Sequence, residues 1–439
     1  MTLRSETRSL VILGASARAL AASAVAAGWS VDAADLFCDV DLVSLARRTV
    51  PATAAGGGDY PWCLADAARR LAPAAPFSYT GALENHPDLV ATIAVDRPLA
   101  GTGADALRRL RDPDCLAAAV RAAGLGFPET FRDETGLPTD GTFLVKPLAG
   151  AGGRGIRVWH GPEPADPWGR SVDRPDGERP RPRPRVWQRF VRGAAISASY
   201  AMSRGEARLF GVSRQLLGRR WCHAAGFTWC GAVATRWTGR PSWERRLHAP
   251  LSRLGDVLGE VFGPLGVVGV DLVLRPDHEL TVIEVNPRPT ASMELFERLG
   301  AISVARAHLS ACGLAEGGPI SGSPRASVAA PGGPAWAKVV LFAARPTFVS
   351  QTLLATVLSA AEPWTESDGG WPSLADIPRP GQTIPAGLPV VTVFGCGATP
   401  FRAVRAIRKR TARLDSLLAA AQPASLRGAA SAAAWAATR

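Results

Sequence analysis

The sequence predicts an α/β protein of more than one domain, and three observations carry this prediction. A chain of 439 residues exceeds what one ordinary hydrophobic core holds, so two or three domains are expected. Apolar runs with the length of strands alternate with helical patterns from the start of the chain. Strand and turn signals then dominate residues 335–400, which resemble a separate small C-terminal domain.

The N-terminal part, residues 1–105, is expected to form an α/β domain. Residues 9–13 are typical of a buried strand, an Ala-rich helix follows from about residue 17 to 27, and a second strand begins at Ser30. This βαβ opening places the N–H groups of a helix start at the carboxyl end of a strand. The turn after the first strand lacks the G-x-G-x-x-G pattern, so a structural domain is favoured over a dinucleotide site.

Composition narrows the classes of function. The formal charge of +12 comes from dispersed residues without a basic–aromatic motif, so nucleic acid is not expected as a partner. An Arg-rich surface or a basic cleft for an anionic nucleotide or acidic small molecule explains the charge equally well. No run approaches the roughly 18 apolar residues of a membrane span, so no membrane partner is expected.

A cytoplasmic location is expected from the N-terminus and the cysteines. The Ala-rich N-terminal stretch resembles a signal peptide, but Arg18 and the glycines at 14 and 28 interrupt it. The seven cysteines are scattered and form no C-x-x-C pair, which predicts neither a disulfide framework nor a zinc site.

A glycine-rich loop follows a strand that carries one of only three lysines in the chain. The predicted strand 142–147 contains Lys146 and runs into Gly150-Ala-Gly-Gly-Arg-Gly155. Glycines let backbone N–H groups approach phosphate oxygens, and a lysine is a compact positive charge for the same phosphates. The spacing does not fit a Walker A loop, and a plain hairpin tip would also explain the glycines.

The strongest signal is an apolar hairpin over residues 267–288 with acidic residues on one face. If Arg275 and Leu280 flank a four-residue loop, Asp271 lies directly opposite Glu284. The opposite face is apolar and suits a core; it carries Val270, Leu272, Leu274, Ile283 and Val285.

Two opposed carboxylates repel each other unless a positive group lies between them. Asp271 and Glu284, together with the amide oxygen of Asn286, make an all-oxygen ligand set that suits Mg²⁺ held with substrate phosphates. Arg288 would point at the same place as an anion clamp. A solvent-facing acidic pair on an edge hairpin is the alternative.

These elements together resemble the ATP-grasp superfamily, which includes D-alanine–D-alanine ligase, biotin carboxylase and archaeal tyramine–glutamate ligase. The resemblance covers roughly residues 105–310, where the motifs occur in the family's order. They are Lys146-Pro, the glycine loop 150–155, Gln188-Arg-Phe-Val191, Asp271 and Glu284-Val-Asn-Pro-Arg288. Gly14-Ala-Ser-Ala-Arg18, Asp376-Ile-Pro and Gly387-Leu-Pro-Val also resemble a carboligase-like branch.

The resemblance implies an ATP-grasp fold with a Rossmann-like α/β domain over 1–105 and a small β-rich C-terminal domain. The ATP-grasp domain would span 106–325, with a lid and a Pro/Arg-rich insertion at 161–185. Residues 335–439 would hold the C-terminal domain and an Ala-rich tail.

The resemblance also implies the activity, an ATP-dependent ligase that forms an amide through an acyl phosphate. ATP and Mg²⁺, with Mn²⁺ as a substitute, would be required. The partners would be two small molecules, a carboxylate and an amine. Resemblance to tyramine–glutamate ligase suggests glutamate as the acid and cofactor biosynthesis as the pathway. A homodimer is a further expectation that the sequence leaves open.

Roles for individual residues follow from the same resemblance. Arg288 would be catalytic, steadying the transferred phosphoryl group. Arg214 and Gln215 would contact substrate. Asp271, Glu284 and Asn286 would hold the metal. ATP would contact Lys146, Gly150, Gly152, Gly153, Arg154, Gly155, Gln188, Phe190 and Val191.

Three departures from the family pattern keep alternatives open. Cys115 stands where a phosphate-binding lysine is usual, and Ala195 where an acidic ribose contact often lies. Arg288 is followed by Pro-Thr-Ala-Ser-Met-Glu rather than the Gln-Val-Glu-His of biotin-dependent carboxylases. An ATP-dependent carboxylase and a nucleotide-binding protein that has lost catalysis are therefore the alternatives to the ligase.

Overall fold

The computed structural model describes residues 8–52, 60–162, 184–237, 242–315, 334–361 and 371–421. The predicted insertion at 161–185 and the end of the Ala-rich tail lie largely or wholly outside these ranges. Within the described ranges, no helix combines the length and apolar character needed to cross a membrane.

The N-terminal domain is a parallel sheet with strand order β3-β2-β1-β4, which confirms the βαβ opening. A side chain at position 14 would not fit, because a Cβ there would lie 2.1 Å from the Thr80 Oγ1. The elements are β1 (Ser9–Gly14), α1 (Arg18–Ala26), β2 (Ser30–Asp35), α2 (Val40–Leu45), β3 (Arg48–Pro51), α3 (Cys63–Arg69), β4 (Phe77–Tyr79), η1 (Leu83–Asn85) and α4 (Pro87–Asp96).

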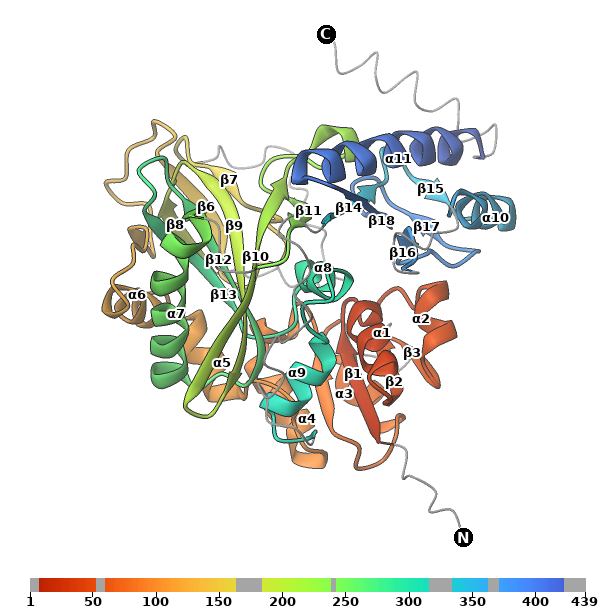
Figure 1. Ribbon diagram of the computed structural model, residues 1–439, viewed down its shortest axis with the longest axis horizontal. Coiled ribbons are helices and arrows are strands. Elements are labelled where there is room, and N and C mark those ends of the chain that lie inside the picture. The colour runs from red at the N-terminus through yellow and green to blue at the C-terminus, as the bar shows by residue number, and fades with distance from the viewer. Residues whose placement is uncertain are drawn as a thin grey trace, which may run out of the picture.

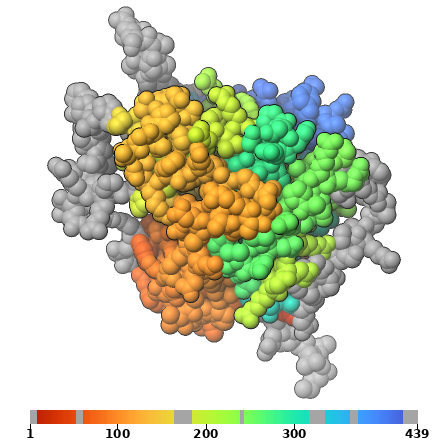
Figure 2. Space-filling model, turned by 90° about the vertical axis from the view of Figure 1, so that its left-hand side faces the viewer, coloured from red at the N-terminus to blue at the C-terminus, as the bar shows by residue number. Residues whose placement is uncertain are grey.

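Two helices follow this domain along the chain, and a third helix from later in the sequence packs against them. Asp112 caps the second of them, its side chain accepting hydrogen bonds from the backbone N–H groups of Asp114 and Cys115. Figure 2 shows the orange segment that contains the first two helices lying between the N-terminal domain and the small sheet, beside the green third helix. The three are α5 (Ala104–Arg111), α6 (Pro113–Ala122) and α7 (Ser242–Phe262).

A small antiparallel sheet carries the predicted lysine strand, in the order β5-β8-β6-β7. Its buried face holds an aromatic cluster of Phe143, Trp159 and Trp187. This cluster fixes the sheet from which the glycine loop projects. The strands are β5 (Thr130–Phe131), β6 (Phe143–Pro147), β7 (Arg157–Val158) and β8 (Arg185–Arg189).

The large sheet has eight strands in the order β13-β12-β9-β10-β11-β14-β18-β16. Of the C-terminal segment, β14 pairs with β11, β18 with β14 and β16 with β18, so these three strands extend the large sheet, whereas β15 and β17 form a two-stranded sheet of their own. In Figure 1, helix α11 (blue) lies across the C-terminal strands, above the N-terminal domain (red). The strands are β9 (Ala194–Ser203), β10 (Glu206–Leu217), β11 (Trp229–Ala234), β12 (Gly266–Leu274), β13 (Leu280–Asn286), β14 (Ala335–Phe342), β16 (Leu374–Ala375) and β18 (Pro389–Gly397).

Short helices and a two-stranded ribbon complete the described chain. They are η2 (Arg220–Cys222), η3 (Ala291–Met293), α8 (Glu294–Arg298), α9 (Val304–Ala311), β15 (Thr347–Phe348), α10 (Gln351–Ala360), β17 (Thr383–Ile384) and α11 (Pro400–Ala420).

The predicted β12–β13 hairpin is present, but its pairing next to the loop differs by one residue. We expected Arg275 and Leu280 to pair, whereas Leu274 pairs with Leu280. A β-bulge farther along restores the expected register, so Asp271 does lie opposite Glu284.

Because of the bulge, the apolar face of the hairpin differs from the predicted one. Val282 takes the core position that we assigned to Ile283 and is completely buried. Ile283 instead lines the space between the two sheets. One extra residue therefore adds an apolar side chain to that space while keeping the two carboxylates opposed.

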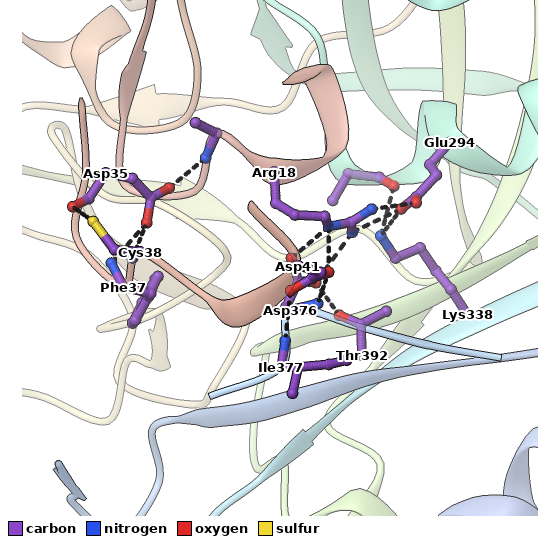
Figure 3. Close-up of polar contacts among 12 residues, drawn as sticks. Arg18, Asp35, Phe37, Cys38, Asp41, Glu294, Lys338, Asp376, Ile377 and Thr392 are labelled. Carbon is purple, nitrogen blue, oxygen red and sulfur yellow. Dashed lines mark hydrogen bonds and ion pairs between the residues drawn. The ribbon is translucent and has the colours of Figure 1, made fainter. Parts of the chain in front are cut away.

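A buried ion cluster fastens the three parts of the chain together (Figure 3). Arg18 of α1 lies between two carboxylates, with its Nη1 2.5 Å from Glu294 Oε1 and its Nε 2.9 Å from Asp376 Oδ1. Lys338 of β14 reaches the same Glu294 at 2.9 Å. Since the side chains of Arg18 and Glu294 are only 5% and 6% exposed, these charges depend on one another.

A second link uses the backbone of the C-terminal segment. The carboxylate of Asp41, at the start of α2, accepts hydrogen bonds from the backbone N–H groups of Asp376 and Ile377, each 2.9 Å long. The motifs around Arg18 and Asp376, which lie far apart in the sequence, therefore meet in one contact.

Replacing Arg18 by Met should destabilise the protein by about 3–5 kcal/mol, because Glu294 and Asp376 would lose the guanidinium between them. Urea unfolding followed by circular dichroism measures the change. Arg69→Met is the matched control, since its ion pair with Asp66 is solvent-exposed and should contribute little. Equal stability losses in the two variants would contradict the assignment.

Candidate active site

Two cavities meet at the centre of the molecule. The inter-sheet cavity, of about 490 Å³, lies between the small and the large sheet. The interdomain cavity, of about 550 Å³, lies between the N-terminal domain, the C-terminal strands and the segment after β13. Both have the size of small-molecule sites. Their shared wall consists of Ala151, Gly152, Trp229, Arg288, Thr290 and Ala291.

The glycine loop 150–155 forms part of that wall and is held from both sides. Asn85 Nδ2 of the N-terminal domain donates to the Gly150 carbonyl over 3.1 Å. The backbone N–H of Trp229 donates to the Gly152 carbonyl over 2.9 Å. The loop therefore lies closed over the inter-sheet cavity.

Gly153 makes the closest approach in the loop. Its φ is +74°, and a Cβ would lie 2.1 Å from the carbonyl oxygen of Phe227. The Phe227 ring packs edge-on against Phe190, with ring centroids 5.8 Å apart. Phe227 thus packs against Phe190, and it also lines the inter-sheet cavity.

Lys146 and Gln188 lie side by side on β6 and β8. Lys146 Nζ donates to Gln188 Oε1 over 2.9 Å, and Gln188 Nε2 donates to the Thr130 hydroxyl over 3.1 Å. Burial lowers the pKa of Lys146, and the carboxylates of Glu284 and Asp271 only partly offset this. The side chain is thus fixed where a nucleotide phosphate would supply the missing negative charge.

The segment after β8, expected to hold the adenine, also lines the inter-sheet cavity at Phe190 and Val191. The backbone N–H of Phe190 already donates to the Thr142 carbonyl over 2.8 Å. A base bound here would therefore use other backbone groups of the segment. Ala195 lines the same cavity and brings no polar group to it.

The acidic residues of the hairpin line the inter-sheet cavity, where two amides orient Asp271 and the Arg111 guanidinium lies 3.5 Å from Glu284 Oε1. The Asp271 carboxylate accepts hydrogen bonds from Gln215 Nε2 at 2.7 Å and from Asn286 Nδ2 at 3.2 Å. Burial and the nearby Glu284 raise the pKa of Asp271 to about 6. A cation between the carboxylates would relieve both effects.

The donor set fits a divalent cation such as Mg²⁺. In the described part of the chain, no group of three His, Cys, Asp or Glu side chains is placed to hold a metal. A cation at Asp271 and Glu284 would therefore have two carboxylates, the Asn286 amide and oxygens of a bound substrate. This is the mixed coordination that Mg²⁺ has in phosphate-binding sites.

Arg288 lies where the two cavities join and lines both. Its Nε and Nη2 lie 2.7 and 2.6 Å from Glu84 Oε1, at the start of the N-terminal helix η1. Burial raises the pKa of Glu84, but Arg288 and Arg111 outweigh burial and bring it below its usual value. Glu84 thus positions Arg288, and no pattern in the sequence predicts this long-range pair.

Arg111 is a second residue that the sequence reasoning missed. Cys115, which stands at the family's lysine position, is exposed. Arg111, the last residue of the preceding helix α5, lines a small cavity beside the inter-sheet cavity together with Lys146 and the glycine loop. Its Nε and Nη2 are buried and form no hydrogen bond with a described residue, although Nη2 lies 3.6 Å from Glu84 Oε1 and Nη1 lies 3.5 Å from Glu284 Oε1. The arginine-rich end of α5 was the available signal.

The two predicted substrate residues separate in the structure. Gln215 faces the inter-sheet cavity and bonds Asp271, as described above. Arg214, the next residue on β10, is exposed and lines neither cavity. Neighbouring residues of a strand point to opposite faces, so the pair cannot serve one site.

Comparison with known proteins agrees with this geometry. Residues 115–292 match the family of ATP-grasp domains. No curated protein matches the chain significantly.

Solved structures show the same fold at low sequence identity. Pyruvate carboxylase from Rhizobium etli is 15% identical with a TM-score of 0.64; the match covers 97% of this chain but only 40% of that one. Biotin carboxylase from Campylobacter jejuni is 13% identical with a TM-score of 0.64, covering 96% of this chain and 98% of that one. L-amino acid ligase from Bacillus licheniformis is 13% identical with a TM-score of 0.60, covering 92% and 97%. The chain therefore has the ATP-grasp fold.

Replacing Glu284 by Gln should abolish the effect of Mg²⁺ on ATP binding, because one of two opposed carboxylates is lost. Calorimetric titration of ATP with and without Mg²⁺ measures this, and circular dichroism verifies the fold. Glu279→Gln, in the exposed loop of the same hairpin, should behave like the wild type. Unchanged Mg²⁺ dependence in Glu284→Gln would remove the metal assignment.

Proposed function

We propose that the protein is an ADP-forming ligase that joins a small carboxylate to an amine through an acyl phosphate. The position of Arg288 is the observation that carries the proposal. Its guanidinium borders both cavities, and a phosphoryl group passing from one bound molecule to the other would cross at this point. A buried, permanently charged fork suits the developing negative charge of that transfer.

The reaction would proceed in two steps. A carboxylate oxygen attacks the γ-phosphorus of ATP, and the bond from that phosphorus to ADP breaks. The amine nitrogen then attacks the carbonyl carbon of the acyl phosphate, and the carbon–oxygen bond to phosphate breaks, releasing phosphate and a proton.

Residues of the chain would serve these steps by position and charge. Lys146 and Arg111 would hold the ATP phosphates, and Arg288 would face the transferred group. Bound Mg²⁺ at Asp271, Glu284 and Asn286 would neutralise phosphate charge. The closed glycine loop would exclude the water that hydrolyses an acyl phosphate.

The alternative reaction is an ATP-dependent carboxylation, and two of the structural relatives named above are carboxylases. The segment after Arg288 argues against it. Glu294, the last residue of that segment, pairs with Arg18 and Lys338 and is therefore committed to the ion cluster. Glutamate remains a candidate acid through the resemblance alone. No disulfide joins any of the seven cysteines, all of which lie in the described ranges, and this supports a reducing compartment such as the cytoplasm.

An ADP-release assay with pools of carboxylic acids and amines tests the proposal. Turnover that requires an acid and an amine together supports the ligase. Turnover that requires bicarbonate supports the carboxylase instead, and tight ATP binding without turnover in any pool indicates a protein that has lost catalysis.

Lys146→Ala should weaken ATP binding about tenfold or more, because a fixed ammonium group is lost from the phosphate site. Calorimetry measures the affinity. Lys409→Ala, on the exposed side of α11, is the matched control and should bind ATP normally. An unchanged affinity in Lys146→Ala would count against the nucleotide site.

Arg111→Ala should likewise weaken ATP binding, since its unsatisfied N–H groups are the proposed substitute for the family's lysine. Binding of ADP and ATP is compared by calorimetry. Arg108→Ala is the control, because Arg108 pairs with Asp88 and Asp105 on the exposed side of α5. Equal ATP affinities for the wild type and Arg111→Ala would show that Arg111 does not replace the phosphate-binding lysine that is missing at Cys115.

A further inference from the structure

The interdomain cavity differs in chemistry from the inter-sheet cavity. Most of its wall is apolar and comes from α1, the segment after β2, and the C-terminal strands. The larger apolar side chains are Leu20, Leu36, Phe37, Val340, Phe342 and Leu388. A molecule that fills this space would therefore have an apolar body.

Nearly all charged groups on this wall already have partners. Arg18 and Lys338 pair with Glu294, and Arg18 also pairs with Asp376. The Glu297 carboxylate accepts hydrogen bonds from the Ser23 hydroxyl and from the Val304 backbone N–H. These groups form the frame of the cavity.

Asp39 is the exception. It lies at the start of α2, lines the cavity, and is only 6% exposed. Its side chain does not cap the helix, and no described residue donates a hydrogen bond to its carboxyl group. A carboxyl group buried in this way destabilises a protein unless a donor or a positive charge reaches it.

The surroundings of Asp39 intensify this cost. Burial and the carboxylates of Asp376, Asp35 and Asp41 raise the pKa of Asp39 to about 9, against a smaller opposing effect of Arg18. Arg18 is already held by Glu294 and Asp376, so it offers Asp39 no hydrogen bond of its own. The Asp39 carboxyl group therefore lacks a positively charged hydrogen-bond donor.

We propose that the interdomain cavity binds the amine substrate, an organic amine with an apolar body whose nitrogen donates to the Asp39 carboxyl group. The proposal rests on the proposed function, which requires an amine beside the carboxylate and ATP. An ammonium or amine nitrogen supplies the donor that Asp39 lacks, and the apolar wall holds the remainder of the molecule.

Calorimetry on the full chain with three probes of equal shape tests the proposal: 3-phenylpropylamine, 3-phenylpropan-1-ol and 3-phenylpropionate. The amine should bind about 10- to 100-fold more tightly than the alcohol or the acid. Asp39→Asn should abolish this preference, and Asp105→Asn, whose side chain is 96% exposed, should retain it. Equal binding of the three probes, no binding at millimolar concentration, or a preserved preference in Asp39→Asn would overturn the proposal.

Stability without ligand gives an independent test. Since the folded protein raises the pKa of Asp39, the cost of its ionisation grows as pH rises above about 4 and levels off above about 9. Asp39→Asn should therefore have a higher Tm than the wild type, with a difference that increases over this range. A lower Tm for Asp39→Asn at every pH would show a structural role and overturn the proposal.

Two further measurements separate this proposal from the ligase itself. Asp39→Asn should bind ATP with Mg²⁺ as the wild type does, because Asp39 does not line the inter-sheet cavity. A wild type that prefers the amine probe but never releases ADP would refute the ligase and leave the amine site standing. Amine-dependent turnover that is unaffected by Asp39→Asn would refute the amine site and leave the ligase standing.

Discussion

The buried ion cluster around Arg18 is the constraint on which the interdomain site depends. That cavity exists only where the N-terminal domain, the segment after β13 and the C-terminal strands meet, and Arg18, Glu294, Asp376 and Lys338 are the charged groups that join them. Separating any part would leave buried charges without partners, which is costly. The cluster therefore fixes the width of the cavity, and its own charged groups are paired with one another.

The same principle distinguishes groups that hold the structure from groups that await a ligand. Glu84 is buried, but Arg288 and Arg111 keep its pKa low. Arg111 has two buried nitrogens without a hydrogen bond to a described residue, and the Asp39 carboxyl group makes no capping hydrogen bond at the start of α2; each residue lines a cavity. Burial without a partner is unfavourable, so these positions indicate where an anion and a cation would complete the protein.

The residues that the sequence assigned to a nucleotide site do lie together around adjoining cavities, because each group of them is local in the sequence. Lys146 and the glycine loop lie within one strand and turn, and Asp271 and Glu284 within one hairpin. The assumed pairing of Arg275 with Leu280 placed those carboxylates opposite each other, and the structure keeps them opposed because a β-bulge offsets the one-residue error in that pairing. The β-bulge that moved Ile283 escaped prediction, since a one-residue insertion leaves the apolar pattern readable in two registers.

The interdomain half could not be predicted, because its contacts join residues that are hundreds of positions apart, such as Arg18 and Asp376. No periodicity relates such pairs, and a lone Asp39 in a sequence resembles any helix N-terminus. The difference has a functional consequence. A phosphate site can be built from backbone and a few local side chains, whereas the cavity proposed for the amine forms only where three separate parts pack together. On the proposed function, the choice of substrate would therefore be a property of the assembled fold, and the Asp39 carboxyl group would be its most specific chemical mark.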